Sequence, residues 1–283
     1  MYRGKILIGS PICQEPEILK AFLNSLSRLN IDNFEMFYHF IDDNHDLRSQ
    51  LLLNGFQEAN KNVTVERISE SSEAQPYRNH QWTYENIWKV ANYKDHIIER
   101  AHKEEFDYLF LIDSDLLLYP QTVSHLINTG KDIIAEIFWT KWAEFAIEQP
   151  QVWLSDFYTQ CEKQMGEVLS QNEEKIRTHH FFQKLRCPGV YEVGGLGACT
   201  LISKTAIERG VSFRPIKNLS LWGEDRHFCV RAIVLGIDLF VDTHYPSYHI
   251  FRAEELHKGL EFLENTAIDK AVQAIDSKEN LLP

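Results

Sequence analysis

The chain alternates between short apolar runs and longer segments whose apolar residues recur every three or four positions. Residues 5–9 form the first apolar run, and residues 17–29 follow with apolar positions at helical spacing. The run at residues 108–112 is the strongest strand signal in the chain. The whole pattern predicts strands at residues 5–9, 34–41, 63–68, 108–112, 132–138, 190–192, 198–203 and 239–242, and helices at residues 17–29, 47–59, 83–102, 120–127 and 224–235.

Strands that alternate with helices predict an α/β fold, in which a mostly parallel sheet is covered by helices on both faces. No linker rich in proline, glycine or serine divides the chain, so we expect one domain over residues 1–252. The polar stretch at about residues 150–180 is predicted to be a helical insert. The strands at 190–192 and 198–203 are predicted to pair with each other.

A C-terminal amphipathic helical tail is predicted for residues 253–283. Its apolar positions form one broad stripe with charged residues opposite, and such a stripe must be buried against the core or against a second copy of the chain. The stripe consists of Leu256, Leu260, Phe262, Leu263, Ala267 and Ala271. The tail is therefore a candidate surface for forming a homo-oligomer.

The charge balance narrows the range of partners. The 283 residues include 29 Lys and Arg against 41 Asp and Glu, and no basic tract is present, which argues against nucleic acid or anionic lipid as the main partner. No apolar run approaches the roughly 20 residues of a membrane-spanning helix. The five cysteines include no CxxC pair, which argues against a disulfide framework or a structural zinc site and favours a cytoplasmic location.

Two acidic clusters follow predicted strands directly. They are Asp42-Asp43 and Asp113-Ser114-Asp115. Ligands of an open parallel sheet bind outside the carboxyl ends of its strands, and closely spaced carboxylates suit hard divalent ions such as Mg²⁺ or Mn²⁺. The alternative is a solvated turn with capping aspartates, but five apolar residues before the second cluster favour the cation.

The segment Leu109 to Asp115 resembles the DxD segment of nucleotide-sugar glycosyltransferases with the GT-A fold, a Rossmann-like α/β fold. Three later features match that class in order. They are the Gly-rich stretch Val193 to Ala198, the acidic pair in Trp222-Gly223-Glu224-Asp225, and a late histidine, His249. The acidic pair resembles the ED motif of family-2-type enzymes. The Gly-rich stretch and the acidic pair also resemble Anp1-type mannosyltransferases.

The resemblance implies a metal-dependent transfer of a sugar from a nucleoside diphosphate sugar to an acceptor hydroxyl of unknown identity. It implies UDP as the preferred nucleotide, with GDP as the alternative, and an inverting reaction, with a retaining one if the Anp1-type likeness holds. The implied roles are Asp113, Asp115 and His249 as ligands of Mn²⁺ or Mg²⁺, Asp225 (or Glu224) as general base, and Asp42, Asp43, Asp113, Ser114, Gly194 and Gly195 as donor-binding residues.

Three further residues are candidates from their residue type and position. Arg78 suits a phosphate, and Trp139 and Trp222 suit stacking on an acceptor sugar. The alternatives are a surface salt bridge for Arg78 and simple packing for the aromatic side chains.

Two other functions stay open at this point. A nucleotidyltransferase that makes nucleotide sugars would carry basic residues in the loop after the first strand, and the loop at residues 9–14 has none. A non-catalytic carbohydrate-binding protein would share the aromatic side chains and would not hydrolyse a donor.

Overall fold

The computed structural model describes residues 4–31, 33–68, 83–220 and 223–279, with the side chains of the last helix described to residue 267. Four parallel strands form the N-terminal half of the main sheet, in the spatial order β3-β2-β1-β4. Their bounds are Gly4–Ile12 for β1, Phe34–Asp42 for β2, Val63–Arg67 for β3 and Tyr108–Leu111 for β4. This half matches the predicted parallel sheet.

The second half of the sheet mixes strand directions. After β4 come β11 (Thr200–Ser203), which is antiparallel to both neighbours, then β6 (Ile133–Thr140) and the long β12 (Leu239–His249), which is parallel to β6. Short strands complete it: β5 (Leu116–Leu117) and β9 (Val190–Val193) pair with β12, and β7 (Gln149–Pro150) pairs with β6. A separate two-stranded sheet joins β8 (Val152–Trp153) to β10 (Gly195–Leu196).

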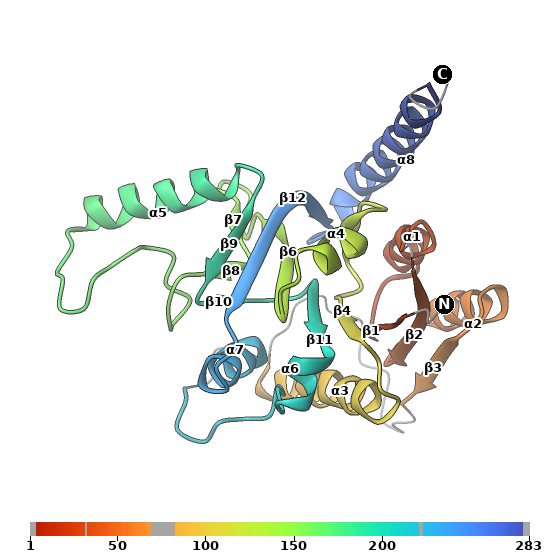
Figure 1. The fold of residues 1–283 in the computed structure, drawn as a ribbon, viewed down its shortest axis with the longest axis horizontal. Coiled ribbons are helices and arrows are strands. Elements are labelled where there is room, and N and C mark those ends of the chain that lie inside the picture. The colour runs from red at the N-terminus through yellow and green to blue at the C-terminus, as the bar shows by residue number, and fades with distance from the viewer. Residues whose placement is uncertain (1–3, 32, 69–82, 221–222, 280–283) are drawn as a thin grey trace.

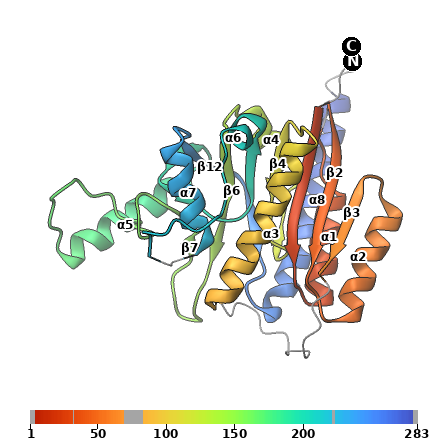
Figure 2. The ribbon, with the colours of Figure 1, turned by 90° about the horizontal axis from the view of Figure 1, so that it is seen from below.

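Helices cover both faces of the sheet, as the pattern predicts (Figures 1 and 2). One core lies under α1 (Pro16–Ser27), α2 (Leu47–Ala59) and α4 (Thr122–Asn128). The other lies under α3 (Tyr84–Lys103), α6 (Lys204–Glu208), α7 (Glu224–Val234) and the end of α5 (Gln171–Leu185). Alternate residues of the central strands supply the two cores, since Leu109 and Leu111 face one and Phe110 faces the other.

The predicted helical insert is only partly helical. Helix α5 begins at Gln171, where Ser170 and Glu173 form a capping box, and residues 151–170 before it contain β8 and loops. Figure 1 shows α5 and its preceding loop extending away from the sheet on one side. The expectation of helix from about residue 150 is therefore wrong for its first half, where few apolar residues recur at helical spacing.

The predicted pairing of residues 190–192 with 198–203 is also wrong. Strand β9 pairs with β12, while β11 lies between β4 and β6. The glycines between the two strands carry β10, which pairs with β8 rather than forming a hairpin turn. The short strand predicted at residues 239–242 continues to His249, past an irregularity between Asp242 and Ser247.

The C-terminal tail begins with a short 3-10 helix, Ala253–Glu255, and continues as α8, Leu256–Glu279. Its buried Leu263 packs with Ile18 and Ala21 of α1, Leu117 and Ile250. The guanidinium of Arg28 donates a hydrogen bond to the carbonyl of Leu263 at 2.6 Å. Part of the predicted stripe is thus buried within the same chain, and a role of the tail in a second copy stays a prediction. Among the described residues, none of the helices has the length and apolar character needed to cross a membrane.

Truncation of Leu263 measures how firmly α8 is docked. Leu263 is 2% exposed whereas Leu260, three residues earlier on the same helix, is 46% exposed. We expect Leu263→Ala to lower the free energy of unfolding by about 2–4 kcal/mol, because it leaves a cavity between α8, α1 and β5. Leu260→Ala should change it by less than about 0.5 kcal/mol. Urea unfolding of both variants measures the difference, and equal effects would show that α8 is not docked through Leu263.

Candidate functional site

The carboxyl end of β4 and the end of β12 bring the DxD turn and His249 together. Leu116, directly after Asp115, pairs with His249 in the antiparallel β5–β12 ladder, and the amide of Ile250 donates to the carbonyl of Asp115 at 2.9 Å. The imidazole Nε2 of His249 lies 3.6 Å from Asp115 Oδ2. Two residues 134 positions apart in the sequence are therefore neighbours because two short strands pair.

The imidazole of His249 is held in one orientation. Its Nδ1 lies 2.8 Å from the hydroxyl of Thr140, on β6. The rings of Phe138 and Phe251 flank it, with centroids 5.0 and 5.6 Å away. Contacts to the far ring nitrogen typically orient histidine ligands of metal ions, and here they direct Nε2 toward Asp115.

Lys94 of α3 connects the DxD turn to the start of α7. Its ammonium lies 2.9 Å from Glu224 Oε1 and 3.6 Å from Asp113 Oδ1, and its side chain is only 7% exposed. Burial lowers the pKa of Lys94, but the charges of Asp113 and Glu224 outweigh burial and raise it above its usual value. A charged lysine therefore lies buried between two acidic segments of the site.

The sequence analysis missed Lys94, although a signal was present. In α3 it occupies the buried stripe that includes Ala91, Ile98 and Ala101, where a lysine is out of place. Lysine is rarely buried without a partner, so its position predicts a buried acidic partner.

Asp113 lies in a crowded acidic environment. Burial raises the pKa of its carboxyl, the charge of Lys94 lowers it, and the nearby charges of Asp115 and Glu224 raise it further. The net effect is an increase. Among the described residues, these carboxylates outnumber the one lysine beside them, so this part of the molecule favours an additional cation.

Asp225 lies in the first turn of α7 and is held by two donors. The hydroxyl of Tyr158 donates to its Oδ1 at 2.7 Å, and the amide of Arg226 donates to the same oxygen at 2.8 Å. Burial and the charge of Glu224 raise the pKa of Asp225 to about 7, against the opposing effects of Tyr158 and Lys94. A carboxyl with this pKa exchanges protons near neutral pH, which is what a general base requires.

Gly223 allows the acidic pair to approach Tyr158. Its backbone φ is 119°, and a Cβ there would lie 2.8 Å from both Asp225 Oδ1 and the Tyr158 hydroxyl. Any other residue would be strained and would push these two groups apart. The glycine before the acidic pair is thus part of the site.

The loop that carries Tyr158 is fixed to α7 by an ion pair. Arg226 donates to both carboxylate oxygens of Asp156, at 2.6 and 2.9 Å. Phe157 and Tyr158 both have positive φ, 62° and 55°, a conformation that costs energy for residues other than glycine. The bidentate pair holds this loop in place, and the sequence analysis did not find Tyr158, Asp156 or Arg226.

The acidic pair at the end of β2 divides into a buried and an accessible carboxylate. Asp42, predicted to contact the nucleoside, has a fully buried side chain that accepts hydrogen bonds from Asn44 and pairs with Arg67 at 3.0 Å. Its contacts are those of a residue that shapes the loop, because both oxygens already have protein donors. Asp43 is 19% exposed and lies 2.9 Å from Lys89 of α3.

The glycines predicted to approach the donor lie against the protein itself. A Cβ on Gly194 would lie 2.1 Å from the carbonyl oxygen of Leu154, and one on Gly195 would lie 2.0 Å from the ring of Trp153. The requirement for glycine therefore comes from packing on the segment at β8. Packing within the chain is thus enough to explain the two glycines, without the donor contact that the resemblance implies.

The remaining predicted residues have mixed placements. Ser114 is buried in the DxD turn. Trp139 lies under the guanidinium of Arg186, which is 3.5 Å from its ring centroid, and contacts the ring of Phe182 edge-on, so packing occupies much of its surface. Arg78 and Trp222 lie outside the described residues.

The side chains at the DxD turn fit a hard divalent cation in part. Two ligand atoms of one ion lie at most about 4.2 Å apart when each bond is about 2.1 Å, and the 3.6 Å between Asp115 and His249 satisfies this limit. Asp113 does not come within 4.8 Å of both of them in the described part of the chain. Its carboxylate is instead close to Lys94.

Comparison with solved structures identifies the fold. The chain aligns with residues 1–349 of TarS from S. aureus at a TM-score of 0.52 and 14% identity, over 87% of this chain and 60% of that one. It aligns with the mannosyltransferase PcManGT from Pyrobaculum calidifontis, in complex with GDP-Man and Mn²⁺, at a TM-score of 0.53 and 10% identity, over 91% and 60%. The chain has the GT-A fold.

The GT-A likeness is one of structure alone. A TarS structure in complex with UDP also matches, at a TM-score of 0.50 and 13% identity, over 86% of this chain and 60% of that one. This chain thus spans about three fifths of each of these matched chains, and 36% of a longer TarS chain. Neither a protein-family model nor a curated protein matches its sequence.

The raised pKa of Asp225 predicts a pH-dependent stability difference. The pKa of Asp225 is higher in the folded chain than the usual 3.8 of the unfolded chain, so protonation of Asp225 stabilises the folded chain. This contribution to the free energy of unfolding is present at low pH and is lost as the pH rises through about 7. An asparagine at this position does not titrate, so the variant does not lose this contribution as the pH rises. Because one pKa unit corresponds to about 1.4 kcal/mol, the free energy of unfolding of Asp225→Asn relative to wild type should rise by at least about 1 kcal/mol from pH 5 to pH 8.

Urea unfolding at the two pH values measures this change. Asp238→Asn is the control, because Asp238 is exposed and precedes β12, at the end of that strand opposite His249, and its relative stability should stay constant. A constant difference for Asp225→Asn as well would show that Asp225 has an ordinary pKa.

Proposed function

We propose that this chain is a glycosyltransferase that moves a sugar from a nucleoside diphosphate sugar to an acceptor hydroxyl. The observation that carries the proposal is the convergence, on a GT-A sheet, of Asp115 and His249 with a carboxyl whose pKa is about 7, Asp225. Both groups lie beside the carboxyl end of β4, linked through Lys94. A cation site and a proton acceptor at one sheet edge are what a metal-dependent, inverting sugar transfer uses.

Asp115 and His249 would hold the divalent cation, with Asp113 as the third ligand once its carboxylate turns from Lys94. When bound, Mn²⁺ or Mg²⁺ would neutralise charge on the departing diphosphate. PcManGT, which shares the fold, contains Mn²⁺ and GDP-Man. The excess of carboxylates over lysine at this site supports the same assignment.

The nucleotide would lie over the carboxyl ends of β1, β2 and β4. We propose UDP, since the TarS structure in complex with UDP has the same fold, and GDP, present in PcManGT as GDP-Man, is the alternative. Two residues are proposed to contact the donor: Asp43, whose carboxylate is partly exposed, and Ser114, which lies in the DxD turn. Arg78 stays a proposal for the phosphates, and the contact proposed for Asp42 is indirect, through the loop that it fixes.

Asp225 is the proposed general base. The carboxylate of Glu224 lies 2.9 Å from the ammonium of Lys94, whereas Asp225 accepts a hydrogen bond from Tyr158 and has a pKa of about 7. One base on the acceptor side corresponds to an inverting transfer. Trp222, which precedes Gly223 in the sequence, is the proposed platform for the acceptor, with Trp139 as the weaker choice.

The metal assignment predicts a loss of nucleotide-dependent stabilisation. Asp115→Ala should abolish the rise in melting temperature that UDP or GDP produces with Mn²⁺, because a ligand that binds only the folded chain stabilises it. Asp238→Ala is the matched control and should behave like wild type. A thermal shift of Asp115→Ala equal to that of wild type would place the cation elsewhere.

The base assignment predicts a large loss of turnover at constant donor affinity. Asp225→Asn should reduce kcat by about 10²–10⁴. Tyr158→Phe should move the acidic limb of the pH profile to higher pH, because the Tyr158 hydrogen bond lowers the pKa of Asp225.

Three outcomes would count against this account. Full turnover by Asp225→Asn would exclude Asp225 as the base. A product anomer that matches the donor, seen by NMR, would indicate a retaining enzyme. No donor hydrolysis and no transfer would leave a carbohydrate-binding protein, and release of pyrophosphate from a nucleoside triphosphate and a sugar phosphate would indicate a nucleotidyltransferase.

A further inference from the structure

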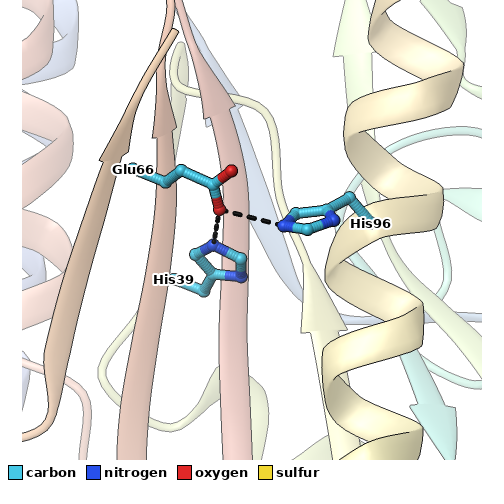
Figure 3. Close-up of side chains that lie close together, drawn as sticks. All are labelled: His39, Glu66 and His96. Carbon is cyan, nitrogen blue, oxygen red and sulfur yellow. Dashed lines mark hydrogen bonds and ion pairs between the residues drawn. The ribbon is translucent and has the colours of Figure 1, made fainter.

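Two clusters of two histidines and one carboxylate lie outside the proposed catalytic residues. The first, the α3 cluster, joins β2, β3 and α3 (Figure 3). Glu66 Oε2 lies 3.2 Å from His39 Nε2 and 2.9 Å from His96 Nε2. Burial and the nearby charge of Arg100 lower the pKa of His39. The cluster contains a single carboxylate, and the neighbouring Arg100 pairs with Glu104 at 2.9 Å.

The second, the α4 cluster, consists of His125 on α4 and Asp242 and His244 on β12. Asp242 Oδ2 lies 3.0 Å from His125 Nε2 and 2.9 Å from His244 Nδ1, and all three ligand atoms lie within 4.8 Å of one another. The carboxylate is fully buried, while the histidine side chains are 30% and 37% exposed. The cluster is thus open to solvent on its histidine side.

A second carboxylate distinguishes the α4 cluster from the α3 cluster. Glu136 on β6 is opposite Asp242 in the parallel β6–β12 ladder and is 1% exposed. It faces the same core as Ile134 and Phe138, two residues away on either side. Its Oε1 accepts a hydrogen bond from the amide of Tyr245, and its carboxyl group lies within hydrogen-bond reach of that of Asp242.

The charge of this pair of carboxylates is not balanced by lysine or arginine. Within the described residues, the cationic partners of Asp242 are the two histidines, and Glu136 forms no ion pair. Two adjacent buried carboxylates are costly unless a proton or a cation neutralises them.

We propose that His125, Asp242 and His244 bind a divalent transition-metal ion, best matched by Zn²⁺, with Glu136 as a supporting carboxylate. Ligand atoms on a tetrahedral zinc ion lie about 3.3 Å apart, and the present separations of 2.9 and 3.0 Å require only a slight opening. Imidazole and carboxylate ligands suit zinc, whereas Mg²⁺ prefers oxygen alone. The cysteine pattern argued against a structural zinc site, but this one uses no cysteine.

The ion would link α4, through His125, to the central strands β12 and β6. It is a site distinct from that of Asp115 and His249 and does not depend on the proposed transferase activity. A bound ion stabilises the folded chain, so the α4 cluster would contribute to stability rather than to catalysis.

The experiment removes the catalytic site first. In an Asp115→Ala, His249→Ala background, calorimetric titration with Zn²⁺ should detect a tight site, and Co²⁺ should give the intense visible absorption of a tetrahedral ion. Adding His244→Asn should abolish the Co²⁺ spectrum and remove one equivalent of Zn²⁺. Adding Glu136→Gln should weaken Zn²⁺ binding by about 10–100-fold.

The α3 cluster supplies the matched control. His96→Asn in the same background should leave the Co²⁺ spectrum and the tight equivalent intact, because it removes the same residue type from the similar cluster. His125→Asn repeats the test should His244→Asn fold poorly, as checked by circular dichroism. An absence of tight Zn²⁺ binding would overturn the proposal and show that a proton alone neutralises the charge of Glu136 and Asp242. Binding that His96→Asn abolishes and His244→Asn leaves intact would likewise overturn the proposal.

Discussion

The buried ammonium of Lys94 is the interaction on which the arrangement of the site depends. It lies between Asp113 after β4 and Glu224 at the start of α7, and so joins three elements that are distant in the sequence. Breaking a buried ion pair by removing one partner typically costs about 3–5 kcal/mol, since the other charge stays buried and uncompensated. The position of α7 relative to the sheet, and with it the position of Asp225, therefore depends on a lysine that does not itself take the proton.

Lys94 also divides the acidic residues into two chemical roles. The carboxylate that it pairs with, Glu224, is bound to an ammonium, while the adjacent Asp225 accepts hydrogen bonds from a hydroxyl and an amide and reaches a pKa of about 7. On the other side, Asp115 and His249 lie at the meeting of β5 and β12. Among the described residues, the ammonium of Lys94 lies between several carboxylates, and this excess of negative charge is the physical basis of the proposed metal dependence.

Much of the fold could be predicted from hydrophobic spacing. Helix α2 has the predicted bounds, Leu47–Ala59, and the strand before the DxD turn differs by one residue. The antiparallel β11 and the pairing of β9 with β12 could not be predicted, because apolar runs carry no information on which strands become neighbours. In the site, motif order predicted Asp115, His249 and Asp225 as candidates, and the structure brings Asp115 and His249 within 3.6 Å of each other. It missed Tyr158 because the loop bearing it is fixed by the Arg226–Asp156 pair, 70 positions apart, and it could not show that Asp42 turns inward to Asn44 and Arg67.

The most direct test of the account is to locate the cation by anomalous diffraction. Crystals grown with Mn²⁺ and a nucleoside diphosphate should show a manganese peak in contact with Asp115 and His249, bridging to the diphosphate, with Asp113 released from Lys94 or bound through water. A nucleotide bound at this sheet edge without manganese beside Asp115, or manganese bound only elsewhere on the chain, would contradict the account.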